Sequence, residues 1–439
     1  MAGNPVQDLH LYWKNKRLIR VNYRRLTSKH KHILCLEQPK TEALLETQFL
    51  AAGGILQRGI EVVGLAEDAE RVQVFTYQHQ TGEKQCLTAR YVVGCDGGKS
   101  KVREQLGFSF PGTNHGSGFI MVDVKLSWSG DLTRVHYFVS DDAFIILIPL
   151  SDEKYRLIIR TPNNENEEIS GDKLAAYQAL IKRYGPAELT LHDIIWASKT
   201  TYYHRLSEHY GRGRVWLAGD ACHLFSSIGG LGMNTGFQDA LGLAWRLAGL
   251  LKNRFSTAVL PTYEQERRSL VQSLIDATNE MTAMITRVNQ DPQALRHWLP
   301  IMANRKRLAT TLPQGFSGLS QRYDKGLLVK NHDTSIGGLV PYFRVIQQGS
   351  RSSSYDFIDG DYFYLLHGNT LADDGFWSRY EKWVKPIRLQ AADWQQVAQA
   401  LDIGDEETVL IRPDGIVAGK ASIHNTQQLF SLLKPLILE

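Results

Sequence analysis

The chain has 439 residues, of which 43% are hydrophobic and 22% charged, with a formal net charge of +4. This length is too great for one ordinary core, so two or three domains are expected. The near-balanced charge gives no reason to expect nucleic acid or an anionic membrane as a partner.

The cysteines and the opening residues indicate the compartment. Cys35, Cys86, Cys95 and Cys222 show no CxxC and no paired Cys/His spacing. This pattern argues against a metal site and against a disulfide framework. No apolar signal-peptide core opens the chain, and no apolar run reaches membrane-spanning length. We therefore expect reduced, mostly buried thiols in a cytoplasmic protein.

The first part of the chain predicts strands around one helix. Residues 1–36 are basic and aromatic and indicate a strand or hairpin. Residues 39–54 carry apolar side chains at helical spacing and end at a double glycine. Residues 60–97 alternate as antiparallel strands do and close with the apolar run YVVGCDG. Residues 117–160 are strand-rich, and the polar residues 161–172 form a loop.

The second part predicts more helix and a separate C-terminal unit. We expect a helix over 173–185, a strand over 191–203, the buried strand RVWLA, and helices over 233–251 and 258–312. Residues 347–356 are a loop or linker candidate. The last eighty residues mix strands and helices, which predicts a small α/β domain.

A glycine and an aspartate directly follow the RVWLA strand. Gly219 allows a ligand to approach the backbone where a side chain would block it. Asp220 stands at the carboxyl end of the strand, where ligands bind in open α/β folds. Its carboxylate can accept hydrogen bonds from sugar or polyol hydroxyls.

A second group of glycines precedes the next helix. Gly229, Gly230 and Gly232 allow the chain to wrap closely around a flat ligand, and Met233 and Asn234 lead into the helix. The free N–H groups of a helix start would stabilise an anionic ligand edge. The alternative is that the glycines only form turns and the aspartate only caps a helix. That interpretation suits one Gly-Asp pair better than three such features within sixteen residues.

Residues 219–248 resemble the "GDAAH…GGxGMNTGxQDAxNLxWKLA" segment of the FAD-dependent aromatic hydroxylases. These are the class A flavoprotein monooxygenases with the para-hydroxybenzoate hydroxylase fold. In that family the aspartate matched by Asp220 binds the ribityl chain of FAD. The backbone matched by Gly232 to Asn234 faces the isoalloxazine ring.

Two further segments are similar to the same family. Residues 91–112 resemble its "GaDGxxSxVRxxLG" motif, in which the residue matched by Asp96 lies near the flavin pyrophosphate and Arg103 is part of the pattern. "QPKTEALL" resembles "QxxTExxL", whose glutamine, here Gln38, contacts the flavin. The resemblance thus implies a cofactor-binding set of Gln38, Asp96, Gly97, Arg103, Gly219, Asp220, Gly230, Leu231, Gly232, Met233 and Asn234.

The sequence departs from the family pattern at two places. The strand–GxGxxG–helix unit that holds the FAD pyrophosphate is not found in these 439 residues. We interpret the chain as N-terminally truncated relative to the family. In addition, Ser226 and Ser227 stand where the family has one or two prolines, which makes that loop more polar and less rigid.

The resemblance implies a mixed α/β fold with an incomplete FAD-binding Rossmann-like domain, an inserted β-sheet substrate domain and a small thioredoxin-like C-terminal domain. The expected boundaries are 1–110 and 196–320 for FAD binding, 111–195 for the substrate sheet, 321–350 for a linker and 351–439 for the C-terminal domain. That last domain has no CxxC, so no thiol redox role follows.

The implied activity is hydroxylation of a phenolic or polyketide-like aromatic, with NAD(P)H and O2, through a flavin hydroperoxide. A homodimer is left open. Two alternatives stay open: a non-catalytic remnant of the fold that binds FAD weakly or not at all, and a flavoprotein oxidoreductase of the same fold that does not hydroxylate. No catalytic side chain is assigned; His223 is interpreted as structural, and Asp239 as a helix residue making local bonds.

Overall fold

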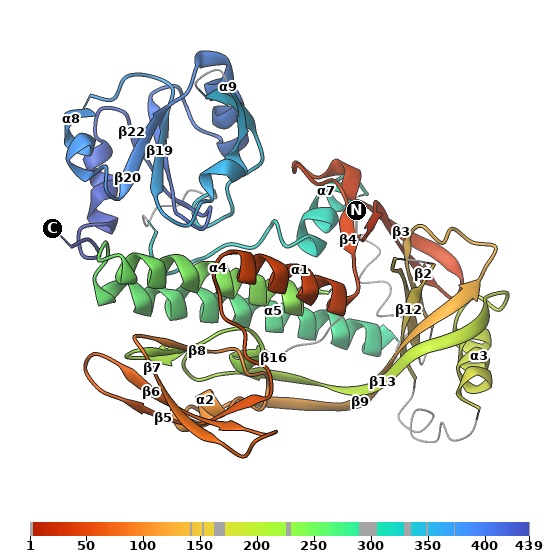
Figure 1. Cartoon of the computed structure of the whole chain (residues 1–439). Helices are drawn as coiled ribbons and strands as arrows, with labels where there is room; N and C mark the ends of the chain where they lie inside the picture. Colours follow the sequence, from red (N-terminus) through yellow and green to blue (C-terminus); the bar gives the residue numbers. More distant parts are fainter. Residues whose placement is uncertain are drawn as a thin grey trace.

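The computed structural model describes residues 3–140, 143–151, 153–161, 172–224, 230–288, 305–328, 335–347, 350–372 and 374–438. Figure 1 shows two long helices across the middle of the molecule, with a C-terminal α/β unit above them and sheets below and to the right. The mixed α/β class expected from the sequence is confirmed.

The largest sheet has eight strands in the order β16-β13-β9-β12-β11-β10-β2-β3. Its pairs are antiparallel except β10 with β2, which run parallel. The N-terminal hairpin expected within residues 1–36 is therefore part of the sheet built mainly by residues 112–206. The strands are β2 (Asp8–Trp13), β3 (Lys16–Asn22), β9 (Gly112–Ser127), β10 (Val135–Val139), β11 (Phe144–Pro149), β12 (Tyr155–Arg160), β13 (Thr190–Leu206) and β16 (His223–Leu224).

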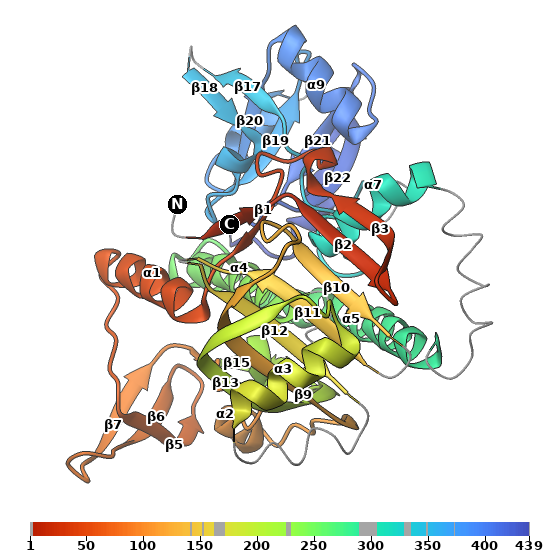
Figure 2. The ribbon, with the colours of Figure 1, turned by 90° about the vertical axis from the view of Figure 1, so that its right-hand side faces the viewer.

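Each face of this sheet is covered by a helix, because alternate side chains of a strand point to opposite faces. On one face Ile145 and Leu157 pack in a cluster with Ile181 of α3 (Lys173–Tyr184). On the other, Phe144 packs in a cluster with Phe316 of α7 (Arg305–Phe316). Buried apolar clusters thus lie on both faces of the sheet, and Figure 2 shows α3 lying against its strands.

A small sheet holds the two glycine–aspartate segments. It consists of β14 (Gly211–Arg212), β15 (Val215–Leu217) and β8 (Val92–Gly94), with β15 and β8 parallel. The short helix α2 (Lys101–Gln105) follows β8, and the long helices α4 (Leu231–Leu251) and α5 (Leu260–Val288) pack beside the sheet.

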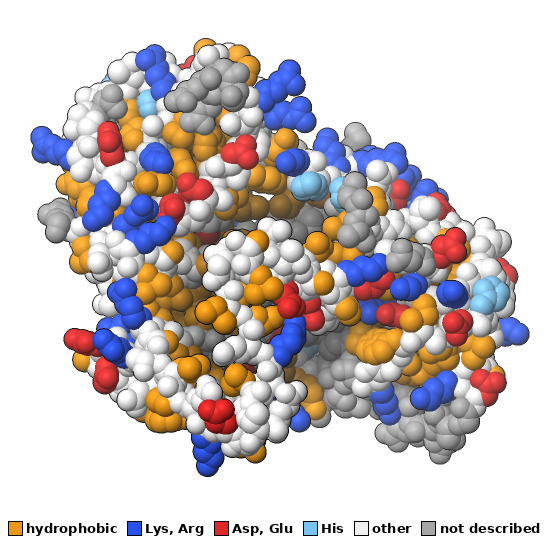
Figure 3. All heavy atoms as spheres, in the orientation of Figure 1, with side chains coloured by type: hydrophobic (Ala, Val, Ile, Leu, Met, Phe, Trp, Pro, Cys, Tyr) orange, Lys and Arg blue, Asp and Glu red, His pale blue; other side chains and the backbone are white. Residues whose placement is uncertain are grey.

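The helix expected between residues 39 and 54 forms as α1 (Gln38–Ala51), but it is not buried. None of its residues is buried. Four of its large apolar side chains are about half exposed: Leu44, Leu45, Phe49 and Leu50. Figure 3 shows hydrophobic side chains at the surface on the face where α1 lies. The antiparallel strands β5 (Ile60–Glu67), β6 (Val72–Gln78) and β7 (Lys84–Ala89) follow, and β1 (Asn4–Val6) pairs with β4 (Ile33–Cys35) before α1.

The C-terminal residues form their own sheet, in the order β20-β19-β21-β22. Its elements are β19 (Phe363–His367), α8 (Asp374–Trp377), β20 (Val384–Arg388), α9 (Ala391–Leu401), β21 (Glu407–Ile411) and β22 (Val417–Ser422). The stretch expected as a loop or linker at 347–356 lies instead in the hairpin of β17 (Arg344–Gln347) and β18 (Ser350–Ser353) and the turn after it. Val340, Phe343 and Val345 are buried in this unit's core.

Buried charges fasten the C-terminal unit to the long helices. Arg412 donates two hydrogen bonds to Glu266 of α5, at 2.7 and 2.9 Å. Trp245 of α4 donates from its indole N–H to Asp414 at 3.1 Å. All four side chains are buried, so the unit is held against the helices by hydrogen-bonded charge as well as by apolar contact.

The four cysteines are free thiols, and they divide into two groups. Cys35 and Cys222 are buried, whereas Cys86 and Cys95 are exposed. The expectation of mostly buried thiols is therefore wrong for two of them, because β7 and the end of β8 lie at the surface.

No helix of the described part of the chain is long and apolar enough to cross a membrane.

Candidate functional site

Two loops leave the same edge of the small parallel sheet. Val215 pairs with Val92 and Leu217 with Gly94, and the Ala218 N–H donates to the Gly94 carbonyl at 3.0 Å. Because the strands run parallel, the loop containing Asp96 and the turn at Gly219–Ala221 both follow carboxyl ends. Carboxyl ends of neighbouring parallel strands are where ligands bind in open α/β sheets.

Arg103 of α2 joins these two loops. Its guanidinium donates to the Ala221 carbonyl and to the Gly98 carbonyl, each at 2.8 Å. The group also lies 3.8 Å from the ring centroid of Phe110, and Arg103 is only 8% exposed. Arg103 therefore fixes the distance between the loops, and direct contact of this side chain with a cofactor stays a prediction.

Asp96 caps the helix that carries Arg103. Its Oδ2 accepts hydrogen bonds from the backbone N–H groups of Lys101 at 2.7 Å and Val102 at 3.1 Å. Gly97 has φ +79°, a left-handed conformation that glycine adopts without strain. Asp96 is exposed even though its carboxylate caps α2.

Gly219 and Asp220 form an open turn. Gly219 has φ +61°, and a Cβ placed on it would meet no atom within 4 Å. The Asp220 side chain is exposed and makes no hydrogen bond to another described residue. Partial burial by the protein raises the pKa of Asp220, and His223 opposes this effect while Asp239 adds to it. Within the described part of the chain, the Asp220 carboxylate thus has no hydrogen-bond donor and lies next to the open backbone of Gly219.

The start of α4 supplies the third side of the site. Gly230 caps the helix with φ +67°, and a Cβ on Gly232 would meet no atom within 4 Å. Asn234 donates its side-chain N–H to the Gly230 carbonyl at 3.0 Å, while Met233 is 51% exposed. The first backbone N–H groups of a helix have no intrahelical acceptor and favour negative charge. With Leu231, these residues leave the helix start accessible to a flat, electron-rich group.

A buried carboxylate lies under the Gly219 turn. Asp239 of α4 accepts from the Gly219 N–H at 3.0 Å, from His223 Nε2 at 2.6 Å and from Arg267 Nε at 2.7 Å. Our interpretation of Asp239 as a residue with only local bonds is wrong, because its partners lie 16 to 28 positions away. His223 is buried in this cluster and has a structural contact there.

Other predicted site residues lie apart from this cluster or outside the described chain. Gln38 is exposed at the start of α1 and donates to Glu42 Oε1 at 2.9 Å. Among the described residues no hydrogen bond joins Gln38 to the two loops, so its contact with the flavin stays a prediction. Gly229, Ser226 and Ser227 lie outside the described residues.

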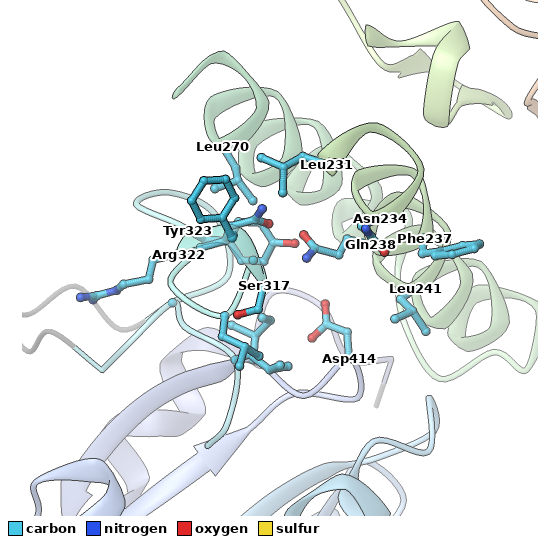
Figure 4. A pocket seen from close by; sticks show the side chains of 17 residues that line it. Leu231, Asn234, Phe237, Gln238, Leu241, Leu270, Ser317, Arg322, Tyr323 and Asp414 are labelled. Atoms are coloured by element: carbon cyan, nitrogen blue, oxygen red, sulfur yellow. The ribbon is translucent and has the colours of Figure 1, made fainter. Parts of the chain in front are cut away.

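A cavity of about 270 Å³ lies beside α4; the predicted cofactor residues Leu231 and Asn234 line it, and residues 219–223 do not. Figure 4 shows Leu231, Asn234 and Gln238 on one wall, with Tyr323 and Asp414 on the others. Ligand pockets for molecules of drug size usually measure about 300–1,000 Å³. We therefore do not assign a large substrate to this cavity.

The donor set fits FAD at its ribityl and ring portions. Asp220 offers an acceptor for hydroxyl groups, Gly219 and Gly232 leave space that a Cβ would fill, and the α4 start favours an anionic ring edge. When these residues are compared with known families, residues 3–278 match the model of the FAD binding domain. This match spans more than half of the chain, so the chain belongs to the FAD-binding domain family and is an FAD-dependent enzyme of the monooxygenase class.

Individual relatives support this classification. The chain is 28% identical over 403 residues to an uncharacterised aromatic compound monooxygenase of Bacillus subtilis, covering 91% of this chain and 78% of the relative. It is 28% identical to a rifampicin monooxygenase of Streptomyces venezuelae, covering 90% of this chain and 77% of that one. The solved structure of an anhydrotetracycline hydroxylase from Streptomyces rimosus matches with a TM-score of 0.78 at 25% identity, covering 95% of this chain and 83% of that one.

Sequence reasoning missed the residues that assemble the site from outside the motifs. Arg267 belongs to the charged stretch YEQERR within α5. This charged run beside apolar residues was the available signal, since buried charges need partners. Phe110 gave no signal, because nothing in its local sequence indicates that it stacks on Arg103.

Proposed function

We propose that this chain hydroxylates an electron-rich aromatic compound, with FAD held by the two strand-end loops and the start of α4. When bound, FAD supplies electron transfer from NAD(P)H and the activation of O2. The observation that carries the proposal is the junction of the loops of Asp96 and Asp220 through Arg103. This junction supports a cofactor site in which the Asp220 carboxylate, the backbone at Gly219 and the start of α4 would contact the same ligand.

Each part of this site has a separate task. Asp220 accepts hydrogen bonds from the ribityl hydroxyls and so sets the position of the ring along the turn. The backbone of Gly232 to Asn234 approaches the ring closely, and the helix start favours the negative charge that a reduced ring carries. Gly97 and Arg103 keep the first loop beside the second. Gly230 and Leu231 set the direction of the helix start.

The proposed substrate is phenolic or polyketide-like. Two relatives are named as a rifampicin monooxygenase and an anhydrotetracycline monooxygenase, and each alignment covers 90% of this chain. The eight-stranded sheet would cover the substrate.

The test has three readouts on the purified chain. FAD uptake is followed by the visible spectrum and by quenching of flavin fluorescence. NADH and NADPH oxidation is then measured with and without simple phenols and an anthraquinone or tetracycline-type aromatic. Incorporation of ¹⁸O from ¹⁸O2 into the product, together with a peroxide assay, separates hydroxylation from simple oxidation of the nicotinamide.

The same readouts separate hydroxylation from other outcomes. A chain that stays colourless at saturating FAD would contradict the proposal. Peroxide without ¹⁸O in the product would indicate an oxidoreductase that does not hydroxylate.

A further inference from the structure

The Gly219 turn is held from below by a charged cluster that lies outside the motif's ligand-facing side. We propose that Asp239 is a positioning residue, which together with Arg267 fixes the backbone of residues 219–223 so that Asp220 is set for the cofactor. This inference rests on the proposed function, because it concerns the same site. Asp239 itself faces the interior and touches no open surface.

Both carboxylate oxygens of Asp239 accept hydrogen bonds, from the turn and from two side chains that pack beside it. One oxygen, Oδ2, accepts both the Gly219 N–H at 3.0 Å and His223 Nε2 at 2.6 Å. The other, Oδ1, accepts Arg267 Nε at 2.7 Å. The Asp239 side chain therefore holds Gly219, the first residue of the turn, and His223, two positions after its end. Asp220 lies between these two attachment points.

Arg267 is itself held in place, because three further hydrogen bonds engage its two terminal nitrogens. Nη1 donates to Gln238 at 3.0 Å and to the Tyr323 hydroxyl at 3.1 Å, and Nη2 donates to the Thr235 carbonyl at 3.1 Å. Three of these anchoring groups, Asp239, Gln238 and Thr235, belong to α4 itself. The guanidinium is thus fixed to the helix whose start forms another side of the site.

The turn and the helix are also in direct contact. A Cβ on Gly236 would lie 3.7 Å from the Gly219 Cα, so no larger spacer separates α4 from the turn. Gly219 has the left-handed φ of +61°, a conformation that its own residue type allows but does not impose. The hydrogen bond from its N–H to Asp239 supplies that constraint.

Burying the charge of Asp239 costs desolvation free energy, and an apolar side chain could fill the same space without that cost. A buried ion pair is weak evidence for stability, because apolar side chains of similar volume often stabilise a core at least as well. Here the carboxylate receives an amide, an imidazole and a guanidinium that point at it from a loop, a strand and a second helix. This convergence fixes one geometry of the turn, which is what a cofactor loop needs.

The test compares Asp239→Asn with a matched control, Glu266→Gln. Glu266 is also a fully buried carboxylate, ion-paired with Arg246 at 2.7 Å and with Arg412, but it makes no contact with the Gly219 turn. Hydrogen–deuterium exchange of the FAD-free proteins is measured peptide by peptide. Asp239→Asn should expose the amides of 217–224 to faster exchange by about tenfold or more, whereas Glu266→Gln should affect the contact with the C-terminal unit and spare this peptide.

FAD affinity is the second readout. Asp239→Asn should raise the FAD dissociation constant about tenfold or more, and Glu266→Gln should leave it within about twofold. Arg267→Lys, which keeps the positive charge but loses the planar fork, serves as the milder variant if Asp239→Asn does not fold. It should give a smaller change in the same peptide and in the same affinity.

The outcomes separate this inference from the proposed function. Wild-type protein that takes up no FAD defeats the proposed function, while the exchange experiment still decides whether Asp239 fixes the turn. Equal exchange of residues 217–224 in wild type and in both Asp239→Asn and Arg267→Lys overturns the inference. Faster exchange of that peptide in Glu266→Gln to the same extent also overturns it, because the effect would then be general loss of stability.

Discussion

Replacing Arg103 by methionine tests whether the two loops depend on each other. Methionine fills much of the same space but removes the two hydrogen bonds of 2.8 Å to the carbonyls of Ala221 and Gly98. Hydrogen bonds from a charged group contribute about 1.5–3 kcal/mol each, and stacking on Phe110 about 0.5–1 kcal/mol. Burial lowers the pKa of Arg103, which means that desolvation of the guanidinium offsets part of this gain. We expect a net loss of about 2–4 kcal/mol in the free energy of unfolding.

The assay is urea unfolding followed by tryptophan fluorescence, with the midpoint compared at an unchanged slope. Arg58→Met is the control: the Arg58 side chain is 74% exposed and pairs with Glu46 at the surface. A surface pair of this kind contributes about 0–1 kcal/mol. Hydrogen exchange should also rise in both 96–99 and 219–224 in the Arg103 variant. Unchanged stability, or a change confined to one of the two loops, would refute the reasoning.

Three further outcomes follow from burial and charge. Burial alone would raise the pKa of Asp239, but Arg267 and His223 outweigh it and hold the pKa at about 2. The ionised Asp239 therefore adds roughly 2 kcal/mol to the free energy of unfolding above pH 4, and this contribution is lost as the pH falls toward 2. The wild type should have a higher urea midpoint than Asp239→Asn by a constant amount from pH 8 to 5, and the difference should shrink below pH 4. Gly249→Ala should lower the melting temperature, since its Cβ would lie 2.0 Å from the buried ring of Phe255, and an unchanged value would contradict that packing. Phe49→Ser should lower the free energy of unfolding by less than about 1 kcal/mol in urea, because the residue is 49% exposed. A truncated core phenylalanine costs about 3–5 kcal/mol, and a loss of that size at Phe49 would show that α1 is buried.

Local pattern was sufficient for the elements around the site. The apolar run before Gly219 predicted a strand, and β15 occupies Val215–Leu217. The glycines before Met233 predicted a helix start, and α4 begins at Leu231. These predictions succeeded because strand burial, left-handed glycines and helix periodicity are all written within a few neighbouring residues.

Long-range contacts were beyond local pattern. Nothing near Arg103 in the chain indicates that its acceptors include Ala221, 118 positions away. The helix α1 was predicted correctly from the spacing of Leu44, Leu45 and Phe49, but that spacing did not tell whether the apolar side chains are covered, and in the structure they are about half exposed. Periodicity reports which side chains share a face, and only the arrangement of the other elements decides whether that face is covered.

The division between cofactor and substrate parts is also a long-range property. Residues of β2 pair in parallel with β10, so Leu9 lies beside Val135 although 126 positions separate them. Parallel pairing leaves no turn signal in the sequence that joins the two strands. For this reason the expected boundary at residue 110 stays a prediction, while the sheet itself is defined by its hydrogen bonds.

The most direct measurement of the central claim is a fluorescence titration of FAD into the wild-type chain and into Asp220→Asn. Asp68→Asn serves as the control, because Asp68 is an exposed carboxylate on the turn between β5 and β6. The account predicts saturable binding to the wild type and to the control, with a dissociation constant raised about tenfold in Asp220→Asn. Equal FAD affinity for the wild type and Asp220→Asn, or no binding to any of the three, would contradict a cofactor site built on these two loops.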